Sequence, residues 1–424
     1  VRATDADDVA HVIGLARETG LELAIRCGGH SAAGHGVSDG GIVLDVRDMK
    51  RLEIDVDGST AWAETGLTTS EYTAAMAAHG LATGFGDTGS VGLGGITLGG
   101  GVGYLVRKHG LTIDSLIAAE VVTADGRILS VDADNHPDLF WAIRGGGGNF
   151  GVATRFLFRL HAVGTSVGGI LVLPATPDTV AGFIAAAEAA PEELSTIANV
   201  MKAPPMPFLP EEAHGKLVIL GMLAYAGDVD AGERVVSPFR ELAEPIADMV
   251  RAIPYPQMYM PEEEGYHPIG VLRSKFVDSL DRDAAEAIVG GLGASTAQMA
   301  VTQIRVLGGA VARVPGGATA FAHRSRRIMM NVAAVFERAD EAVEHDAWAA
   351  GLAAEIGGDD EGVYVNFLGD EGAGRVREAY PGPTWGRVRD AYPGPTWERL
   401  RAIKRRYDPA NLFRLNQNIP PAEQ

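Results

Sequence analysis

The chain has 424 residues, of which 46% are hydrophobic and 21% charged, a composition typical of a globular protein with two or three domains. A formal net charge of −19 argues against nucleic acid or an anionic membrane as a partner, since both are polyanions bound through Lys and Arg, so we expect a small-molecule ligand. The single cysteine, Cys27, excludes an internal disulfide and any zinc or iron–sulfur site made of clustered cysteines.

The sequence also predicts a cytoplasmic protein. No apolar run reaches the roughly 18 to 20 residues that span a bilayer, and no charged-then-apolar leader opens the chain. Val1 is not a natural start, so we expect residues to precede it.

Residues 1–165 are predicted to form an α+β region. The segment 4–20 has a capping residue, acids in its first turn and apolar residues at helical spacing, which predicts a helix that ends at Gly20. Further helices are predicted at 69–80 and 137–144. Short β-like segments predict strands at 21–26, 41–46, 51–56, 60–65, 118–124, 127–131 and 152–160.

Residues 166–370 are predicted to form a second domain. Glycine is scarcer there, and long β-like segments alternate with amphipathic helices, which indicates an antiparallel sheet covered by helices. The β-like segments are 216–227, 297–311, 327–337 and 362–370.

The final segment, 371–424, differs again in composition. Residues 377–388 are followed by a near-copy at 389–400, and two copies are too few for a solenoid, so we interpret them as a duplication accommodated in a surface loop. After it, basic residues on a solvated helix face alternate with a predicted buried stripe made of Leu400, Ile403 and Tyr407.

Two short motifs match enzyme signatures but lie in the wrong context. Ser38 in GVSDG has the spacing of a hydrolase nucleophile, yet a predicted strand follows where a helix is required. GGGNFG at 146–151 has the spacing G-x-G-x-x-G, but a predicted strand follows here too, which argues against a Rossmann helix. The eleven histidines show no paired metal-ligand spacing, so a metal site has no support.

Three glycine-rich stretches remain, at 28–41, 84–103 and 145–151. The backbone N–H groups that glycine exposes can bind a pyrophosphate without side-chain charge. One such stretch alone would be a tight turn. Three in a chain this acidic favour a dinucleotide that lies along loops.

Several motifs together resemble one enzyme family. They are IRCGGHS followed by DGGIVLDV, then VGLGGITLGGGVGYLVRKHGLTIDSL, VVTADG, DLFWAIRGGGGNFGV and the terminal RYDPANLFRLNQNIPP. In the family order, and over nearly the whole chain, they are similar to the FAD-linked oxidases of the berberine-bridge-enzyme-like group. That group lies within the vanillyl-alcohol-oxidase, or PCMH-type FAD-binding, superfamily. The resemblance extends to its bacterial branch with 6-hydroxynicotine and sugar oxidases.

This resemblance implies a two-domain α+β fold. The FAD-binding domain would comprise residues 1–165 and the returning segment 371–424, with the substrate domain, 166–370, inserted between them. A few dozen residues normally precede the first motif in the family, so the first subdomain is expected to be incomplete here.

The resemblance also implies how FAD is attached. The loop CGGHS would wrap the pyrophosphate, and His30 would bond covalently to the flavin 8α-methyl group; a turn histidine with an ordinary hydrogen bond is the alternative. Many relatives carry a second link from a cysteine, whose place is taken here by Thr88, so a single link is expected. Cys27, expected to be an exposed thiol in the first loop, does not replace it. Val91 takes the place of the oxygen gatekeeper, where valine resembles the oxygen-reactive members, although a core valine would pack there equally well.

The FAD contacts implied in this way come from the glycine stretches and from two asparagines of the tail, and no metal ligand is implied. The residues are Arg26, Cys27, Gly28, Gly29, His30, Ser31, Gly34, Thr88, Val91, Gly92, Gly94, Gly95, Leu98, Gly99, Gly100, Gly101, Gly103, Asn149, Gly151, Val152, Asn416 and Asn418.

Tyr364 is the candidate catalytic residue. A strand at this place would set Tyr364 and Asn366 on the face opposite Val365, which suits the roof of a pocket. The resemblance implies that this tyrosine faces the flavin and helps to remove the substrate's hydroxyl or amine proton. A free tyrosine has a pKa of about 10 and needs a cation or a hydrogen-bond network to act as a base. His323 and Arg324 are candidates for that partner, with a solvated or structural role as the alternative.

The implied activity is that of an FAD-dependent oxidoreductase. As an oxidase, it would remove a hydride from an alcohol or amine carbon of a small molecule and pass the electrons to O2, giving H2O2. A dehydrogenase with another acceptor and a flavin-binding protein without turnover are the alternatives. The substrate and the oligomeric state stay open.

Overall fold

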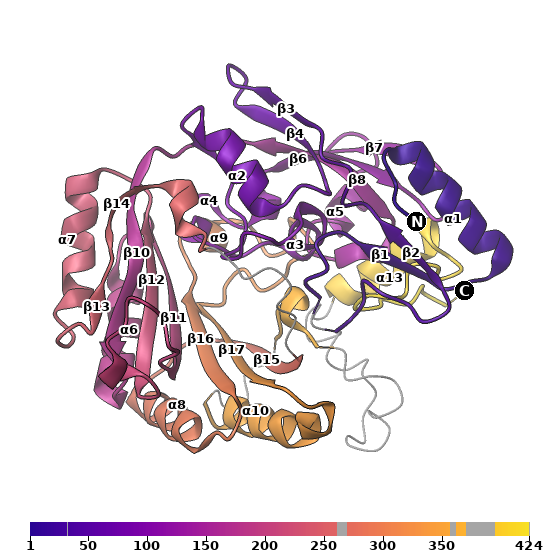
Figure 1. Ribbon diagram of the computed structural model, residues 1–424. Helices are drawn as coiled ribbons and strands as arrows, with labels where there is room; N and C mark the ends of the chain where they lie inside the picture. The colour runs from indigo at the N-terminus through magenta and orange to yellow at the C-terminus, as the bar shows by residue number, and fades with distance from the viewer. Residues whose placement is uncertain (32, 261–268, 357–361, 370–394, 424) are drawn as a thin grey trace.

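The structure is a computed structural model that describes residues 1–31, 33–260, 269–356, 362–369 and 395–423. It confirms a mixed α+β architecture, built around two large antiparallel sheets that lie side by side (Figure 1). In the described ranges, no helix has both the length and the apolar character needed to cross a bilayer.

The first region runs from the N-terminus to residue 162, and its predicted helices and strands are all present. Its elements are α1 (Ala6–Thr19), β1 (Leu23–Arg26), β2 (Ile42–Asp45), β3 (Leu52–Asp55), β4 (Thr60–Glu64), α2 (Thr69–Ala77), β5 (Leu81–Ala82), α3 (Leu93–Gly99), α4 (Val106–His109), η1 (Thr112–Asp114), β6 (Leu116–Val122), β7 (Ile128–Val131), α5 (Pro137–Ala142), η2 (Gly147–Asn149), β8 (Val152–Arg159) and β9 (His161–Ala162).

Local sequence explains the first helix, and packing explains the first sheet. The Asp5 side chain caps α1 by accepting the Asp8 N–H, and Gly20 ends the helix with a left-handed φ of 70°. The sheet has five strands in the order β3-β4-β8-β6-β7. Beneath it, the rings of Tyr72, Phe85 and Phe158 meet edge to face at 5.1 to 5.9 Å. This core supports the glycine loops that follow β5 and α5.

The second region carries an eight-stranded sheet with helices on one face. Its strand order is β13-β10-β12-β11-β16-β17-β15, with β14 also paired to β10. The elements are β10 (Thr165–Pro174), α6 (Pro177–Ala189), β11 (Leu194–Lys202), η3 (Glu211–Ala213), β12 (Leu217–Tyr225), α7 (Val229–Arg240), β13 (Ala247–Asp248), β14 (Arg251–Pro254), η4 (Tyr255–Met258), β15 (Ile269–Val277), α8 (Arg282–Ala294), β16 (Met299–Val306), α9 (Ala310–Arg313), β17 (Ile328–Phe336), η5 (Ala339–Glu341) and α10 (Ala342–Ile356).

Alternation along β16 shows how the two faces of this sheet differ. Ala300 and Ile304 are buried in the core under the helices. Met299 and Val301 belong to the other face, which turns towards the first region (Figure 1). The functional residues of the second region should therefore lie at odd-numbered positions of this strand.

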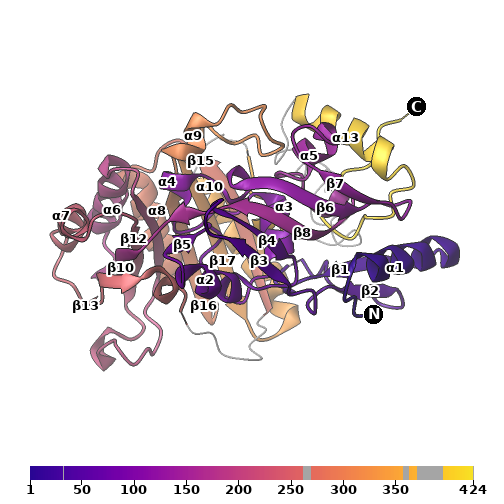
Figure 2. The ribbon, with the colours of Figure 1, turned by 90° about the horizontal axis from the view of Figure 1, so that it is seen from above.

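The described part of the tail, residues 395–423, packs against the first region. Helix α13 (Pro395–Tyr407) packs beside α5 (Figure 2), and Leu400, Ile403 and Tyr407 are buried there, which confirms the apolar stripe. One basic residue of this helix departs from the prediction of a solvated face, because Lys404 is 0% exposed. Its buried carboxylate partner, described below, is the physical reason.

The segment 362–370 is not a strand, contrary to prediction. Residues Val365–Phe367 form a 3₁₀ turn, η6, closed by the Phe367 N–H that donates to the Tyr364 carbonyl at 2.9 Å. Gly362 leads into it with a φ of 134°, a backbone conformation that favours glycine, and Asp370 lies outside the described residues. The Phe276 N–H of β15 donates to the Gly362 carbonyl at 3.1 Å, so the segment starts beside the sheet edge, and the local 3₁₀ turn then takes the place of strand pairing.

The predicted duplication is only partly described. Residues 377–394 lie outside the described ranges, whereas 395–400 form the first turns of α13 and not a surface loop. The domain boundaries at 165/166 and 370/371 stay predictions.

Candidate active site

A cavity of about 520 Å³ lies between the glycine loops of the first region and the face of the second sheet that bears Gln303 and Arg305. The first two glycine stretches touch directly, because a Cβ at Gly28 would overlap the backbone of Gly92. Of the residues predicted from the sequence, those lining the cavity are Arg26, Cys27, Gly28, Gly29, His30, Ser31, Thr88, Val91, Gly92, Gly94, Gly95, Leu98, Asn149, Gly151, Val152, Tyr364 and Asn416.

The other predicted contacts do not line this cavity: Gly34, Gly99, Gly100, Gly101, Gly103 and Asn418. Close packing explains the glycines after α3. A Cβ at Gly101 would overlap the Thr112 hydroxyl, and one at Gly103 would overlap the Phe85 carbonyl. These glycines therefore let chain segments approach each other, and they are not part of the cavity wall.

His30 is an exposed residue at the cavity rim. It follows Gly29, whose φ of 76° needs a residue without a side chain, and its Nε2 lies 2.7 Å from the Ser90 hydroxyl oxygen. Ser90 belongs to the second glycine stretch. The imidazole thus lies where the first and second glycine loops meet.

Cys27 is not the exposed thiol that the sequence predicted. The side chain is partly buried, and its Sγ donates to the Thr65 carbonyl at 2.8 Å. Burial raises the pKa of this thiol, so the protonated form is favoured. Cys27 forms part of the cavity wall and packs against Gly92 and Gly94.

The Tyr364 side chain is buried at 2% exposure and lines the cavity. Its phenol oxygen accepts the Gly101 N–H at 2.9 Å and the Asn366 Nδ2–H at 3.0 Å. Two donors on one phenol oxygen stabilise its phenolate form. Burial nevertheless dominates and raises the pKa of Tyr364 to about 12.

The two residues that the sequence suggested as partners of the Tyr364 phenol make other contacts in the structure. Arg324 forms a two-pronged ion pair with Asp114 at 2.7 and 2.8 Å. His323 stacks on the Phe276 ring with centroids 4.7 Å apart, and neither residue lines the cavity. The structure therefore favours the structural role that was the alternative for both residues, because both side chains are held in these contacts.

Arg305, on β16, is the cation that sequence reasoning missed. It lines the cavity at 2% exposure, and its charge lowers the pKa of Tyr364 against the effect of burial. Its Nη2 pairs with Asp87 Oδ2 at 2.6 Å, and its Nη1 donates to Gln303. An arginine inside a predicted strand with no other charged residue was the available signal.

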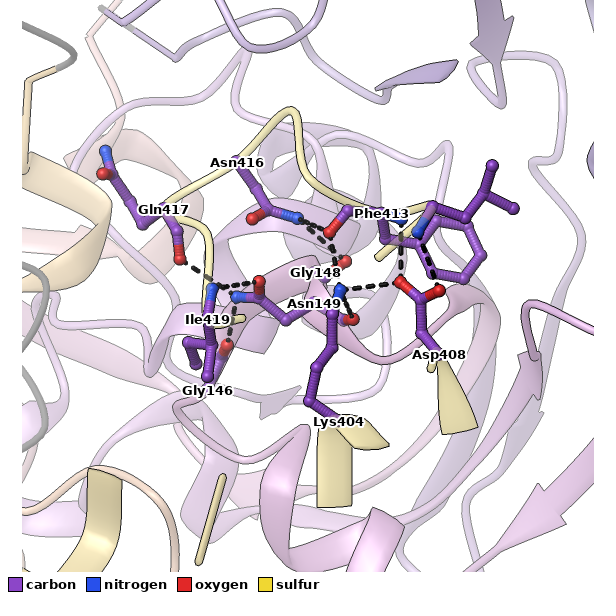
Figure 3. Close-up of polar contacts among 10 residues, drawn as sticks. Gly146, Gly148, Asn149, Lys404, Asp408, Phe413, Asn416, Gln417 and Ile419 are labelled. Atoms are coloured by element: carbon purple, nitrogen blue, oxygen red, sulfur yellow. Dashed lines mark hydrogen bonds and ion pairs between the residues drawn. The ribbon is translucent and has the colours of Figure 1, made fainter. Parts of the chain in front are cut away.

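The buried lysine of α13 joins the tail to the third glycine stretch (Figure 3). Lys404 Nζ donates to Asp408 at 2.7 Å and to the carbonyls of Asn149 and Phe413 at 2.8 and 2.9 Å. Asp408, also 0% exposed, accepts the N–H groups of Leu412 and Phe413. The ammonium and the carboxylate therefore satisfy each other and four backbone groups while fully buried.

Asn149 completes the junction. Its Oδ1 accepts the Ile419 N–H at 2.9 Å, and its Nδ2 donates to the carbonyls of Gly146 and Gln417 (Figure 3). Asn416 donates to the Gly148 carbonyl at 3.2 Å. The predicted tail asparagines differ in role, since Asn416 lines the cavity and Asn418 does not.

The residues present fit an FAD molecule. At Gly95 and Gly148, both in the cavity wall, no atom lies within 4 Å of the place where a Cβ would be, so their backbone is open to a ligand. No lysine is among the described lining residues, which leaves backbone N–H groups and Arg26 for a pyrophosphate. Among described residues the buried Asn416 Oδ1 has no hydrogen-bond partner, as expected of an atom that a ligand satisfies.

Comparison with known proteins points the same way. A family model described as an FAD binding domain matches residues 1–132, and one described as berberine and berberine like matches residues 363–420. The chain is 30% identical over 423 residues to the uncharacterized FAD-linked oxidoreductase YgaK of Bacillus subtilis, covering 98% of this chain and 89% of the relative. It is also 30% identical over 445 residues to (R)-6-hydroxynicotine oxidase of Paenarthrobacter nicotinovorans, covering 99% and 90%.

Solved structures share the fold. The crystal structure of 6-hydroxy-D-nicotine oxidase from Arthrobacter nicotinovorans superimposes with a TM-score of 0.83 at 26% identity, covering 99% of this chain and 91% of that one. A chitooligosaccharide oxidase gives the same TM-score at 22% identity, covering 100% and 91%.

Proposed function

The chain belongs to the berberine-bridge-enzyme-like group of FAD-linked oxidoreductases, and we propose that it is an oxidase for an alcohol or amine carbon of a small molecule. In the reaction, the substrate loses a C–H and an O–H or N–H bond and gains a C=O or C=N bond, while O2 is reduced to H2O2. FAD supplies the hydride acceptor for this chemistry when it is bound. The observation that carries the proposal is the buried Tyr364 phenol in the cavity wall, with two N–H donors on its oxygen.

The chain's own residues would manage the proton. Tyr364 takes the hydroxyl or amine proton of the substrate, and the donors Gly101 and Asn366 stabilise the charge that its oxygen carries before the transfer. Arg305 adds a buried positive charge on the same side of the cavity. The glycine loops hold the cofactor, and the proton transfer falls to Tyr364, whose pKa Arg305 lowers.

We infer further that FAD is attached through His30 alone. His30→Ala should release the flavin: after acid precipitation the yellow colour should stay with the native polypeptide and appear in the supernatant of the variant. The matched control is His35→Ala, which changes another histidine of the same cavity wall and should keep the colour on the polypeptide. Absorbance of pellet and supernatant measures both.

Thr88, at the place of a second attachment cysteine, supports a single link. Peptide mapping of the native protein should find flavin on the His30 peptide only. A doubly linked flavopeptide would contradict the single link, and native colour in the supernatant would contradict any covalent link.

Val91 supports O2 as the electron acceptor, and Val91→Leu tests it. Val91 lines the cavity and is only partly buried, so a larger side chain there should hinder O2. We expect reoxidation of the reduced flavin to slow by about tenfold or more, equivalent to a barrier increase of about 1.4 kcal/mol, with anaerobic reduction near its native rate. Stopped-flow absorbance follows both steps. If the native reduced flavin is already inert to air, the protein is a dehydrogenase.

A further inference from the structure

A row of polar side chains crosses the second sheet on the face that lines the cavity. Asn199 on β11, Gln303 on β16, Asn331 on β17 and Ser274 on β15 stand opposite one another in register. Gln303 Nε2 donates to Asn199 Oδ1 at 2.9 Å, and the Ser274 hydroxyl accepts the Tyr364 N–H at 3.3 Å. The row therefore leads along the sheet to the catalytic residue.

The row on one side of it is apolar. Two residues along each strand, the same register gives Met201, Val301, Ala333 and Leu272. A sheet face that only packed against the first region would continue this apolar pattern. Four consecutive polar positions, of which Gln303 and Asn331 line the cavity, thus have a purpose other than packing.

Asn331 is the member of the row that could accept a hydrogen bond from a ligand. It lines the cavity at 8% exposure, and its Oδ1 has no hydrogen-bond partner among the described residues. Leaving a buried polar atom unsatisfied costs free energy, so a ligand that donates a hydrogen bond to it would recover that cost. Gln303, next to it in register, lines the same wall.

The formal charges of the cavity-lining residues restrict which class of ligand the cavity can bind. Of the described lining residues, Arg26, Asp87 and Arg305 carry formal charge. Arg26 belongs to the first glycine loop, and Asp87 and Arg305 neutralise each other at 2.6 Å. No unpaired carboxylate or cation in this described set is left near Tyr364 to bind an ammonium or a carboxylate group.

We infer that the substrate is an uncharged alcohol with several hydroxyl groups, bound through the side-chain amides of Gln303 and Asn331. A hydroxyl both donates and accepts, which matches an amide pair that offers both functions. One hydroxyl carbon is presented to Tyr364 and oxidised to a carbonyl, and the others bind the polar row. This inference rests on the proposed oxidase function and specifies its substrate.

The test uses the flavin-loaded protein and three sets of candidate substrates. Glucose, cellobiose and myo-inositol represent neutral polyols, pyrrolidine and N-methylpyrrolidine represent amines, and lactate and glycolate represent hydroxy acids. We expect only compounds of the polyol set to bleach the flavin under anaerobic conditions. A non-oxidisable analogue of the polyol that bleaches it should raise the melting temperature of the protein. Bleaching by an amine or a hydroxy acid and by no polyol overturns the substrate class and leaves the oxidase function intact. A preparation that lacks flavin absorbance overturns the proposed function itself.

Variants then test the two amides. Asn331→Leu and Gln303→Leu should each raise KM for the polyol by about 3- to 10-fold with kcat nearly unchanged, the effect of losing one hydrogen bond made equally in ground and transition states. Thr302→Val is the matched control, because Thr302 lies on β16 beside Gln303 but is 0% exposed and has the parity of the helix-covered face. Its KM should be native. If Asn331→Leu shifts the oxidised flavin spectrum while KM stays native, the row contacts the cofactor and the inference fails.

Discussion

Tyr364→Phe should slow anaerobic reduction of the flavin by about 10²- to 10⁴-fold, the range typical of a general acid or base. The substitution keeps the ring, whose edge-to-face contacts with Phe321 and Phe367 hold it in place, and removes only the oxygen that accepts from Gly101 and Asn366. Reoxidation by O2 should be unaffected, since it involves no substrate proton. Stopped-flow absorbance under anaerobic and aerobic conditions separates the two steps.

The control for this variant is His323→Asn. His323 packs on Phe276 outside the cavity, so its loss should leave the reduction rate within a few-fold of native. Val91→Leu should give the opposite pattern, with slow reoxidation and native reduction. If Tyr364→Phe reduces the flavin at the native rate, the base lies elsewhere and the proposed role of the phenol is wrong.

The pH profile gives a second view of the same residue. Burial raises the pKa of Tyr364 to about 12, so near neutral pH only a small fraction is phenolate. If the phenolate is the active base, the reduction rate should rise about tenfold per pH unit over the range in which the protein stays folded, because the phenolate fraction rises by that factor below the pKa. Tyr364→Phe should flatten the profile. Arg305→Met, which removes the charge that lowers this pKa, should displace the profile towards higher pH.

Local chemistry accounts for the parts of the fold that the sequence predicted. The cap at Asp5, the glycine at position 20 and the alternation along 297–311 each act within a few residues, so they can be read without tertiary knowledge. We could predict from the sequence that the three glycine stretches come together, because three such stretches in one acidic chain favour a shared ligand. Which glycines line the cavity could not be predicted, because Gly101 and Gly103 are required by neighbours brought close in the fold.

The residues that sequence reasoning missed are set by long-range pairing. Arg305 pairs with Asp87, 218 positions away, and only the folded chain shows that Arg324 is already committed to Asp114. The segment around Tyr364 alternated like a strand, but beyond Gly362, whose carbonyl accepts the Phe276 N–H of edge strand β15, it closes a 3₁₀ turn. The hydrophobic pattern alone cannot distinguish a strand from a 3₁₀ turn in this segment, since both leave one face apolar.

Lys404→Met should destabilise the protein by roughly 3 to 5 kcal/mol, the cost of leaving a buried carboxylate without its partner. Lys404 and Asp408 are both 0% exposed, and the methionine fills the space of the lysine stem but donates to neither Asp408, Asn149 nor Phe413. The urea midpoint of unfolding, followed by tryptophan fluorescence, measures the loss. Because the same junction holds Asn149 and Asn416 in the cavity wall, flavin fluorescence should rise at lower urea than in the native protein.

Two comparisons isolate the charge from the packing in this junction. Arg406→Met, on the same helix, breaks an exposed ion pair with Asp138 and should cost no more than about 1 kcal/mol. Lys404→Met combined with Asp408→Asn should recover part of the loss, because the neutral amide oxygen still accepts from Leu412 and Phe413 without an uncompensated charge. If Lys404→Met costs no more than Arg406→Met, the buried pair does not hold the tail to the third glycine stretch. If the double variant is as unstable as the single one, the lost hydrogen bonds of the ammonium, and not the stranded carboxylate, set the cost.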